Sequence, residues 1–121
     1  MDEIERTIVL PPRARALSDY ARMYAQPADG LVNAAYFIPI FGNRRRCNDL
    51  SRRRSEITKV EFYAAQALVC PVPQGMRAGD RLWVDDDQVL PVINDAGCTL
   101  VHVSFDANKH KFNKIACEQE F

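Results

Sequence analysis

The chain ends with two cysteines separated by a sequence that has the pattern of a β-hairpin. The segment CTLVHVSFDANKHKFNKIAC runs from Cys98 to Cys117, and apolar and polar residues alternate in its first half, as in a strand with one buried face. Residues 106–109, DANK, have the Asx chemistry that turns favour. A hairpin centred between Ala107 and Asn108 places Cys98 opposite Cys117. Because opposed Cα atoms lie about 4.5–5.5 Å apart, this register predicts a disulfide.

The same register assigns the other side chains of the hairpin to two faces. It pairs Phe105 with His110, Val103 with Phe112, and Val101 with Lys114. One face, which we expect to join the core, collects apolar residues of both strands: Val101, Val103, Phe105, Phe112 and Ala116. The opposite face collects both cysteines and mostly polar residues: His102, Ser104, Lys111, Asn113 and Ile115.

A metal or redox site at these cysteines is the competing interpretation. His102 lies about 13 Å along the strand from Cys98 at about 3.3 Å per residue, whereas zinc ligands lie within about 2.3 Å of the ion. The hairpin therefore cannot gather Cys98, Cys117 and His102 around one ion, and the chain has no C-x-x-C redox motif. We predict a structural disulfide and no cofactor or metal. Reduced thiols and metal or redox chemistry stay open as alternatives.

The cysteine pairing also bears on the compartment. The chain has four cysteines, so a second bridge, Cys47–Cys70, follows by elimination alone. Persistent disulfides are typical of oxidising compartments, and we predict a periplasmic or secreted protein, with the cytoplasm as the alternative. The start, MDEIERTIVLPP, has early acidic residues and no apolar core of a signal peptide. Export therefore requires that a signal has been removed.

Length and charge limit the domain organisation and the classes of partner. The 121 residues predict an extended N-terminal arm over residues 1–12 and a single domain over residues 13–121. Sixteen basic and sixteen acidic residues cancel, so the whole chain has no bias toward nucleic acid or anionic membranes. No apolar run reaches the length of a membrane span, about 18 residues.

The order of predicted elements gives the fold class. In residues 13–25, Leu17, Tyr20, Ala21 and Tyr24 have the spacing of one helix face. Residues 31–40 and 81–84 predict strands, with Pro39 at a strand end or on an edge strand. Residues 57–69 fit both helix and strand, and the sequence AAQAL favours helix.

We therefore predict an α+β domain in which the N-terminal helix, and a second helix if residues 57–69 are helical, packs on a small antiparallel sheet. The sheet ends in the disulfide-closed hairpin. The predicted core residues are Leu17, Tyr20, Tyr24, Val32, Ala34, Tyr36, Leu82, Val101, Val103, Phe105 and Phe112.

Short motifs spread over about half of the chain carry a resemblance. They are the LPP element, the DYARMY segment, RLWV, LPVI and the GC…C hairpin at the end. On these motifs the chain resembles uncharacterised small exported bacterial proteins. The resemblance implies export and a small α+β fold, and it implies no activity.

The most unusual local feature is a cluster of arginines in RRRCNDLSRRR, which we predict to be a polar loop. Its six guanidinium groups belong to Arg44, Arg45, Arg46, Arg52, Arg53 and Arg54. Guanidinium groups bind carboxylates and phosphates in bidentate fashion, so an acidic protein surface is the predicted partner. The absence of interleaved aromatic residues argues against nucleic acid. The alternative without a binding role is a solvated loop whose positive charge is balanced by acidic residues of the same protein.

Other polar features give weaker signals. Residues 85–87, DDD, lack the spacing of an EF-hand loop and predict a plain acidic turn. The sequence contains no catalytic motif, and Ser104 and His102 lie about 6.6 Å apart on a strand, too far for a nucleophile–base pair.

We predict a non-catalytic, exported binding protein that uses the arginine-rich segment. A small-ligand or enzymatic domain with a cleft between helix and sheet, formed by convergent tyrosines or by His102 or His110, is the first alternative. A cytosolic nucleic-acid-binding protein with reduced cysteines is the second.

Overall fold

The fold is described from a computed structural model, which covers residues 1–39, 44–70, 75–84, 87, 90 and 97–117. It is an α+β fold around one five-stranded mixed sheet with the strand order β3-β1-β2-β4-β5. The strands are β1 (Ala21–Ala28), β2 (Leu31–Phe37), β3 (Arg81–Val84), β4 (Leu100–Asp106) and β5 (Lys111–Cys117). The α-helices are α1 (Asp2–Thr7), α2 (Arg44–Arg52) and α3 (Lys59–Val69). Short 3-10 turns are η1 (Leu17–Asp19), η2 (Arg54–Glu56) and η4 (Gly97–Thr99).

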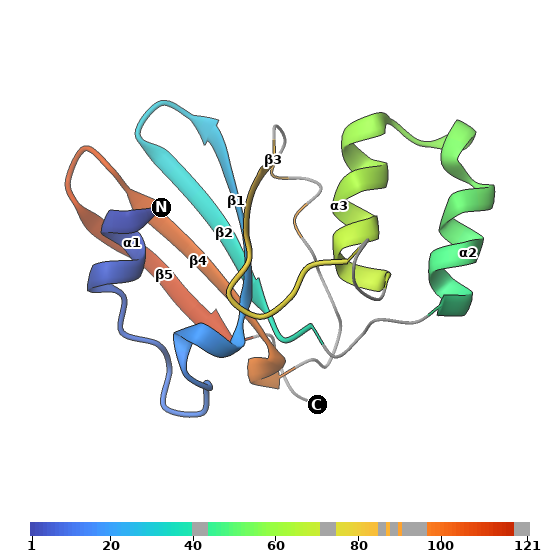
Figure 1. The fold of residues 1–121 in the computed structure, drawn as a ribbon. Coiled ribbons are helices and arrows are strands. Elements are labelled where there is room, and N and C mark those ends of the chain that lie inside the picture. The colour runs from blue at the N-terminus through green and yellow to red at the C-terminus, as the bar shows by residue number, and fades with distance from the viewer. Residues whose placement is uncertain (40–43, 71–74, 85–86, 88–89, 91–96, 118–121) are drawn as a thin grey trace.

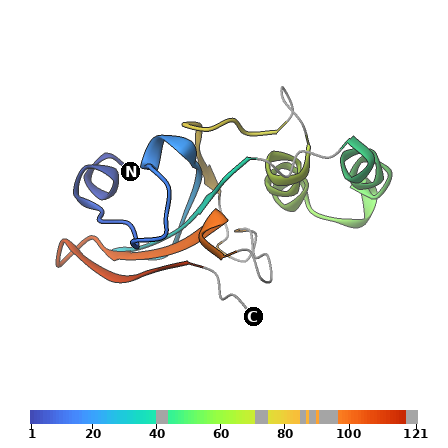
Figure 2. The ribbon, with the colours of Figure 1, turned by 90° about the horizontal axis from the view of Figure 1, so that it is seen from below.

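The sheet separates two layers of helices. α1 and the chain that follows it lie on one side of the sheet, and α3 lies on the other side, between the sheet and α2 (Figures 1 and 2). Strands β2, β4 and β5 pair antiparallel, as predicted, and β1 joins them antiparallel, whereas β3, which we expected in an antiparallel sheet, pairs parallel with β1 at the sheet edge. Both faces of the sheet therefore bury apolar side chains.

The predicted helix over residues 13–25 is wrong, because this segment contains η1 and then β1. β1 is a central strand whose residues Ala21 to Ala25 are all buried, so no alternation is visible in its sequence. Ala21 and Met23 pack in the cluster that includes Ala67 of α3, whereas Tyr20 and Tyr24 pack toward α1. A spacing of four residues keeps two side chains on the same face in a strand as well as in a helix. The spacing of Tyr20 and Tyr24 is therefore compatible with a strand as well as with the predicted helix.

The predicted strand over residues 31–40 is confirmed as β2, which lies between β1 and β4. Pro39 follows the strand end, as predicted, and residue 40 lies outside the described part. The predicted strand over residues 81–84 is confirmed as β3. The ambiguous segment is helical, and Thr58 caps α3 by accepting a hydrogen bond from the backbone N–H of Glu61. Thr58 and Glu61 have the spacing of a capping box, a helix signal in the sequence.

We expected residues 1–12 to be extended, but Asp2–Thr7 form α1. Acidic residues in the first turn suit the positive end of the helix dipole. Ile4 of α1 is buried in the core cluster beside the tyrosines of β1 and β2, so the N-terminal segment packs on the sheet rather than extending from it.

The C-terminal hairpin forms, but the predicted register is wrong. Phe105 pairs with Phe112, and an irregularity at Asn113 then shifts the pairing, so that Val103 lies opposite Ile115 and Val101 opposite Cys117. Two features cause the shift. The turn is centred one residue later than predicted, with the Asp106 side chain accepting hydrogen bonds from the N–H groups of two following residues. The extra residue is a β-bulge, which moves the following side chains to the opposite face. Ile115 and Cys117, rather than Ala116, therefore pack against the core.

The disulfide between Cys98 and Cys117 is confirmed despite the different register. Cys98 lies in η4, just before β4, and its Cα atom is 4.6 Å from that of Cys117. The predicted pair Cys47–Cys70 is also bonded, with the Cα atoms 4.7 Å apart.

Most of the predicted core is confirmed. Eight of the predicted residues are buried: Tyr20, Tyr24, Val32, Ala34, Tyr36, Val101, Val103 and Phe105. The other three are only partly buried: Leu17, Leu82 and Phe112.

Candidate functional site

The arginine-rich segment is a helix rather than the predicted loop. Four of the six arginines, Arg44, Arg45, Arg46 and Arg52, lie in α2, Arg53 follows it, and Arg54 begins η2. Arginine has a high intrinsic helix propensity, which allows a helix without an apolar face. No residue of α2 is buried. The helix is attached to α3 by the Cys47–Cys70 disulfide and forms the outermost element of the molecule (Figure 2).

This unit, α2 and α3 with the turn between them, is called the helical hairpin below. Residues 44–61 contain seven basic and three acidic residues, whereas the whole chain is neutral. Two of the acids pair locally: Asp49 Oδ1 lies 3.0 Å from Arg52 Nη1, and Glu56 Oε2 lies 3.1 Å from Arg53 Nε. The hairpin therefore carries a local excess of positive charge.

The remaining arginines differ in their surroundings. The guanidinium carbon of Arg54 lies 4.7 Å from the ring centre of Phe62, in a cation–π contact. Within the described part of the chain, Arg44 and Arg45 have no ion-pair partner, and both side chains are exposed. The first turn of α2 contains no acidic residue. Because cations there oppose the helix dipole, this turn concentrates unbalanced positive charge.

A small groove separates the two helices of the hairpin. It has a volume of about 220 Å³. Its lining combines apolar and charged side chains: Arg46, Asp49, Leu50, Arg53, Ala65 and Val69. The groove can therefore receive a small apolar group while guanidinium groups contact anions beside it.

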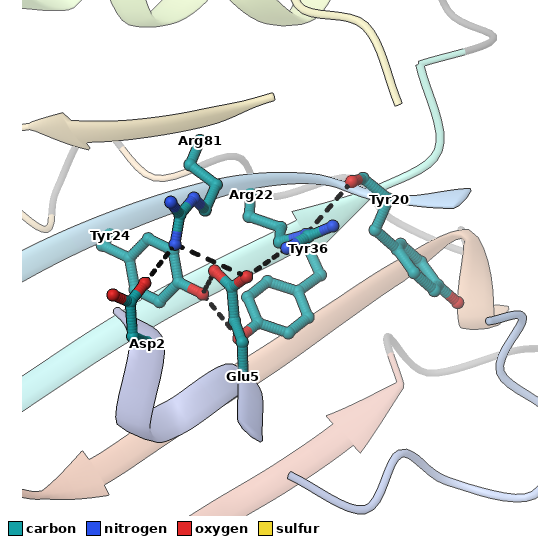
Figure 3. Close-up of polar contacts among 7 residues, drawn as sticks. All are labelled: Asp2, Glu5, Tyr20, Arg22, Tyr24, Tyr36 and Arg81. Atoms are coloured by element: carbon teal, nitrogen blue, oxygen red, sulfur yellow. Dashed lines mark hydrogen bonds and ion pairs between the residues drawn. The ribbon is translucent and has the colours of Figure 1, made fainter. Parts of the chain in front are cut away.

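A second cluster of polar side chains lies between α1 and the sheet, and sequence reasoning missed it (Figure 3). Glu5 of α1 accepts hydrogen bonds from Arg22 and from the Tyr24 hydroxyl, both of which belong to β1. The Tyr24 and Tyr36 hydroxyls lie 2.8 Å apart. Arg81 of β3 approaches the same carboxylate, with Nη1 3.8 Å from Glu5 Oε1. This buried set is called the Glu5 network below.

The Glu5 network holds its tyrosines in the neutral form. Burial raises the pKa of Tyr36 to about 12. Burial, followed by the neighbouring Tyr36, raises the pKa of Tyr24 well above the ordinary value of 10.0. Within the described residues, no buried side-chain nitrogen or oxygen lacks a hydrogen-bond partner. The network therefore has the character of a satisfied structural contact that fixes α1 on the sheet.

Polar contacts at the surface attach α1 at two further points. Arg81 Nη1 lies 2.6 Å from Asp2 Oδ1, and the arginine lowers the pKa of that carboxyl. His110 Nδ1, in the hairpin turn, lies 2.7 Å from Glu3 Oε1. His110 thus contacts α1 and does not lie in the hairpin pairs as predicted.

The predicted cleft of tyrosines and histidines is not found among the described residues. Tyr20, Tyr24 and Tyr36 are fully buried, and His102 lies within β4 between Ala35 and Ala116. A larger cavity of about 570 Å³ lies elsewhere, beside the Cys98–Cys117 disulfide. Its lining is mainly apolar: Pro11, Pro12, Arg13, Cys98, Ile115, Ala116 and Cys117.

All four cysteines are disulfide-bonded. This finding removes the reduced-thiol alternative and the metal alternative at the cysteines, and it is consistent with an oxidising compartment. In the described parts of the chain, no cluster of His, Cys, Asp or Glu side chains is arranged to hold a metal ion. Of the predicted acidic turn, residues 85 and 86 lie outside the described part, and Asp87 accepts a hydrogen bond from Asn33 at 3.3 Å. Among described helices, none is long and apolar enough to span a membrane.

Comparisons with protein families, with curated proteins and with solved structures find no match to this chain. The resemblance to small exported bacterial proteins therefore stays a prediction, and the candidate site stands on its geometry and charge.

Proposed function

We propose that the protein is a non-catalytic binding module that holds an acidic partner protein on the arginines of its helical hairpin. The observation that carries this proposal is the concentration of six exposed arginines on a disulfide-attached helix and the turn that follows it, at the edge of the molecule. Guanidinium groups bind carboxylates in bidentate fashion, so such a surface suits an acidic protein.

The six arginines are exposed and lie outside the core of the sheet, which supports a role in binding. No residue of α2 is buried, and the core clusters of the sheet include no residue of α2. The excess positive charge at the start of α2 opposes the helix dipole at a cost of about 0.3–1 kcal/mol per cation. Carboxylates of a partner would remove this cost, because they neutralise the charge where it is least favourable.

The two disulfides support an oxidising compartment. We propose the periplasm or the extracellular space, and in either place a partner protein is a more available anion than nucleic acid. A basic helix can also bind nucleic acid through phosphates. Binding of single-stranded nucleic acid usually also needs exposed aromatic side chains for base stacking. Among the residues described, the most exposed large aromatic side chain is Trp83, which lies on β3 and not on α2.

The test is a charge-neutralising variant that keeps helix propensity. All six arginines are replaced with glutamine, and Lys109, Lys111 and Lys114 of the β-hairpin are replaced with glutamine in the control. The probe is fluorescently labelled polyglutamate, measured by anisotropy over a salt series. We expect the arginine variant to lose at least about ten-fold in affinity, with unchanged circular dichroism, and the control to bind like wild type. Equal binding by the arginine variant contradicts the proposal, and tighter binding of single-stranded DNA than of polyglutamate favours the nucleic-acid alternative.

Small-ligand binding is a second candidate, which the cavity beside Cys98–Cys117 favours. Its volume of about 570 Å³ lies within the range of ligand sites, about 300–1,000 Å³. Replacing Ala116 with tryptophan should fill this cavity. A library of apolar anions screened by thermal shift should then include compounds that stabilise wild type and not this variant. A library without such compounds contradicts the second candidate.

A further inference from the structure

We infer that the acidic partner inserts one aliphatic side chain into the groove between α2 and α3, while carboxylates beside that side chain bind the arginines at the groove. This inference rests on the proposed function and specifies its partner as an acidic peptide segment with an apolar anchor.

The lining of the groove supports a mixed contact. Leu50 contributes an apolar side chain from α2, and Ala65 and Val69 contribute apolar surface from α3. Arg46 and Arg53 line the same groove from the α2 side. A purely charged partner would leave the apolar surface exposed to water, whereas an aliphatic side chain would bury it at a gain of about 25 cal/mol per Å².

The size of the groove limits what enters it. Its volume of about 220 Å³ is smaller than the roughly 300–1,000 Å³ of typical small-molecule sites. It therefore suits one side chain rather than a cofactor or a sugar. An α-helix or strand of the partner would remain on the surface, with a single residue directed between the helices.

The charges around the groove favour an acidic segment. Asp49 also lines the groove, but its carboxylate is paired with Arg52 at 3.0 Å. Arg53 donates its Nε–H to Glu56, and a guanidinium group has five donors in total. Arg53 can therefore bind a partner carboxylate and keep its contact with Glu56.

The groove is fixed before binding. The Cys47–Cys70 disulfide joins the two helices, with Cα atoms 4.7 Å apart, and the groove residues Leu50 and Val69 follow and precede these cysteines in the sequence. A preformed groove reduces the cost of ordering on association. The anchor should consequently add measurable affinity.

The experiment compares two labelled peptides of equal charge, six glutamates around a central leucine and six glutamates around a central serine. We expect wild type to bind the leucine peptide at least about ten-fold more tightly than the serine peptide. The variant Ala65→Met narrows the groove from α3 without changing charge and keeps a strong helix former. It should remove the difference between the peptides and leave the affinity for the serine peptide unchanged.

The outcomes separate this inference from the proposed function. Equal affinity of wild type for both peptides overturns the anchor and leaves acidic binding in place. Failure of wild type to bind either peptide overturns both proposals. Persistence of the leucine preference in Ala65→Met, with an unchanged melting temperature, overturns the location of the anchor in the groove.

Discussion

Removal of the Glu5 carboxylate should destabilise the protein strongly, because it leaves a buried arginine without a counter-charge. The side chains of Arg22 and Glu5 are only 10% and 12% exposed. Loss of one partner of a buried pair costs about 3–5 kcal/mol. We therefore expect Glu5→Leu to lower the free energy of unfolding by about 3 kcal/mol or more. For a chain of this length, this corresponds to a melting temperature lower by about 12 °C.

The two halves of the pair should differ. After Arg22→Met, Glu5 still has Arg81 at 3.8 Å, whereas after Glu5→Leu no carboxylate remains beside Arg22 in the described structure. Arg22→Met should consequently cost less than Glu5→Leu. In the double variant both charges are gone, and Tyr24 keeps its hydrogen bond to Tyr36. Replacement of a buried pair by apolar side chains is often neutral or stabilising, so the double variant should unfold near wild type.

Urea unfolding followed by far-ultraviolet circular dichroism, with both disulfides intact, measures all three variants. The control is Asp49→Asn, which breaks the exposed pair with Arg52 and should change stability by less than about 1 kcal/mol. Strong non-additivity is the expected result. A double variant whose loss equals the sum of the single losses would refute the argument, because the two side chains would then contribute independently.

Three further predictions follow from single contacts. Gly75→Ala should destabilise by about 1–3 kcal/mol in thermal unfolding, because its Cβ would lie 1.8 Å from the carbonyl oxygen of Cys70; an unchanged melting temperature would contradict this. The pKa of Asp2 lies below 3.8, so the contribution of its pair with Arg81 is complete above that pH and disappears as pH falls through the lowered pKa; carboxyl-carbon NMR should detect this, and Arg81→Gln should restore the ordinary value. The pKa of Tyr36 is raised from 10.0 to about 12, so the contribution of its neutral hydroxyl to stability should be fully present below pH 10 and be lost as pH rises toward 12. Phenolate absorbance should show ionisation of Tyr36 only near pH 12 in wild type, and titration at the ordinary value would refute this prediction.

Features that depend on local chemistry could be predicted from the sequence. The run from Leu31 to Phe37 is mostly apolar and follows a glycine, and it forms strand β2. The Asp106 side chain makes its turn contacts with two residues close in sequence, Asn108 and Lys109. The prediction of the Cys98–Cys117 disulfide is correct although the predicted strand register is wrong, because η4 brings Cys98 to the end of β5.

Features that depend on distant partners could not be predicted. Strand β1 has no alternating pattern, because α1 covers one of its faces and α3 covers the other. The bulge at Asn113 has no glycine to indicate it, and it changes the face of every residue that follows. The Glu5 network joins residues that are 17 positions apart in the case of Glu5 and Arg22, and no local spacing encodes such a contact.

The candidate site shows the same division. The composition of the segment from Arg44 to Arg54 identified the charged surface, but a run of arginines with few apolar residues was interpreted as a loop. The segment forms helix α2, which the Cys47–Cys70 bridge attaches to α3. The groove between the two helices has no sequence signature, because its two walls come from segments separated by the turn at η2.

That one bridge also determines under which conditions the protein should be handled. A thiol reductant added during purification would cut the disulfide between α2 and α3 and leave the main chain as their covalent link, while the hydrogen bonds of the sheet would remain. Spectroscopy of the sheet would then report an intact sample even though the basic helix had come loose. Preparations made with and without reductant should therefore be compared as two different forms of the protein in any assay of partner binding.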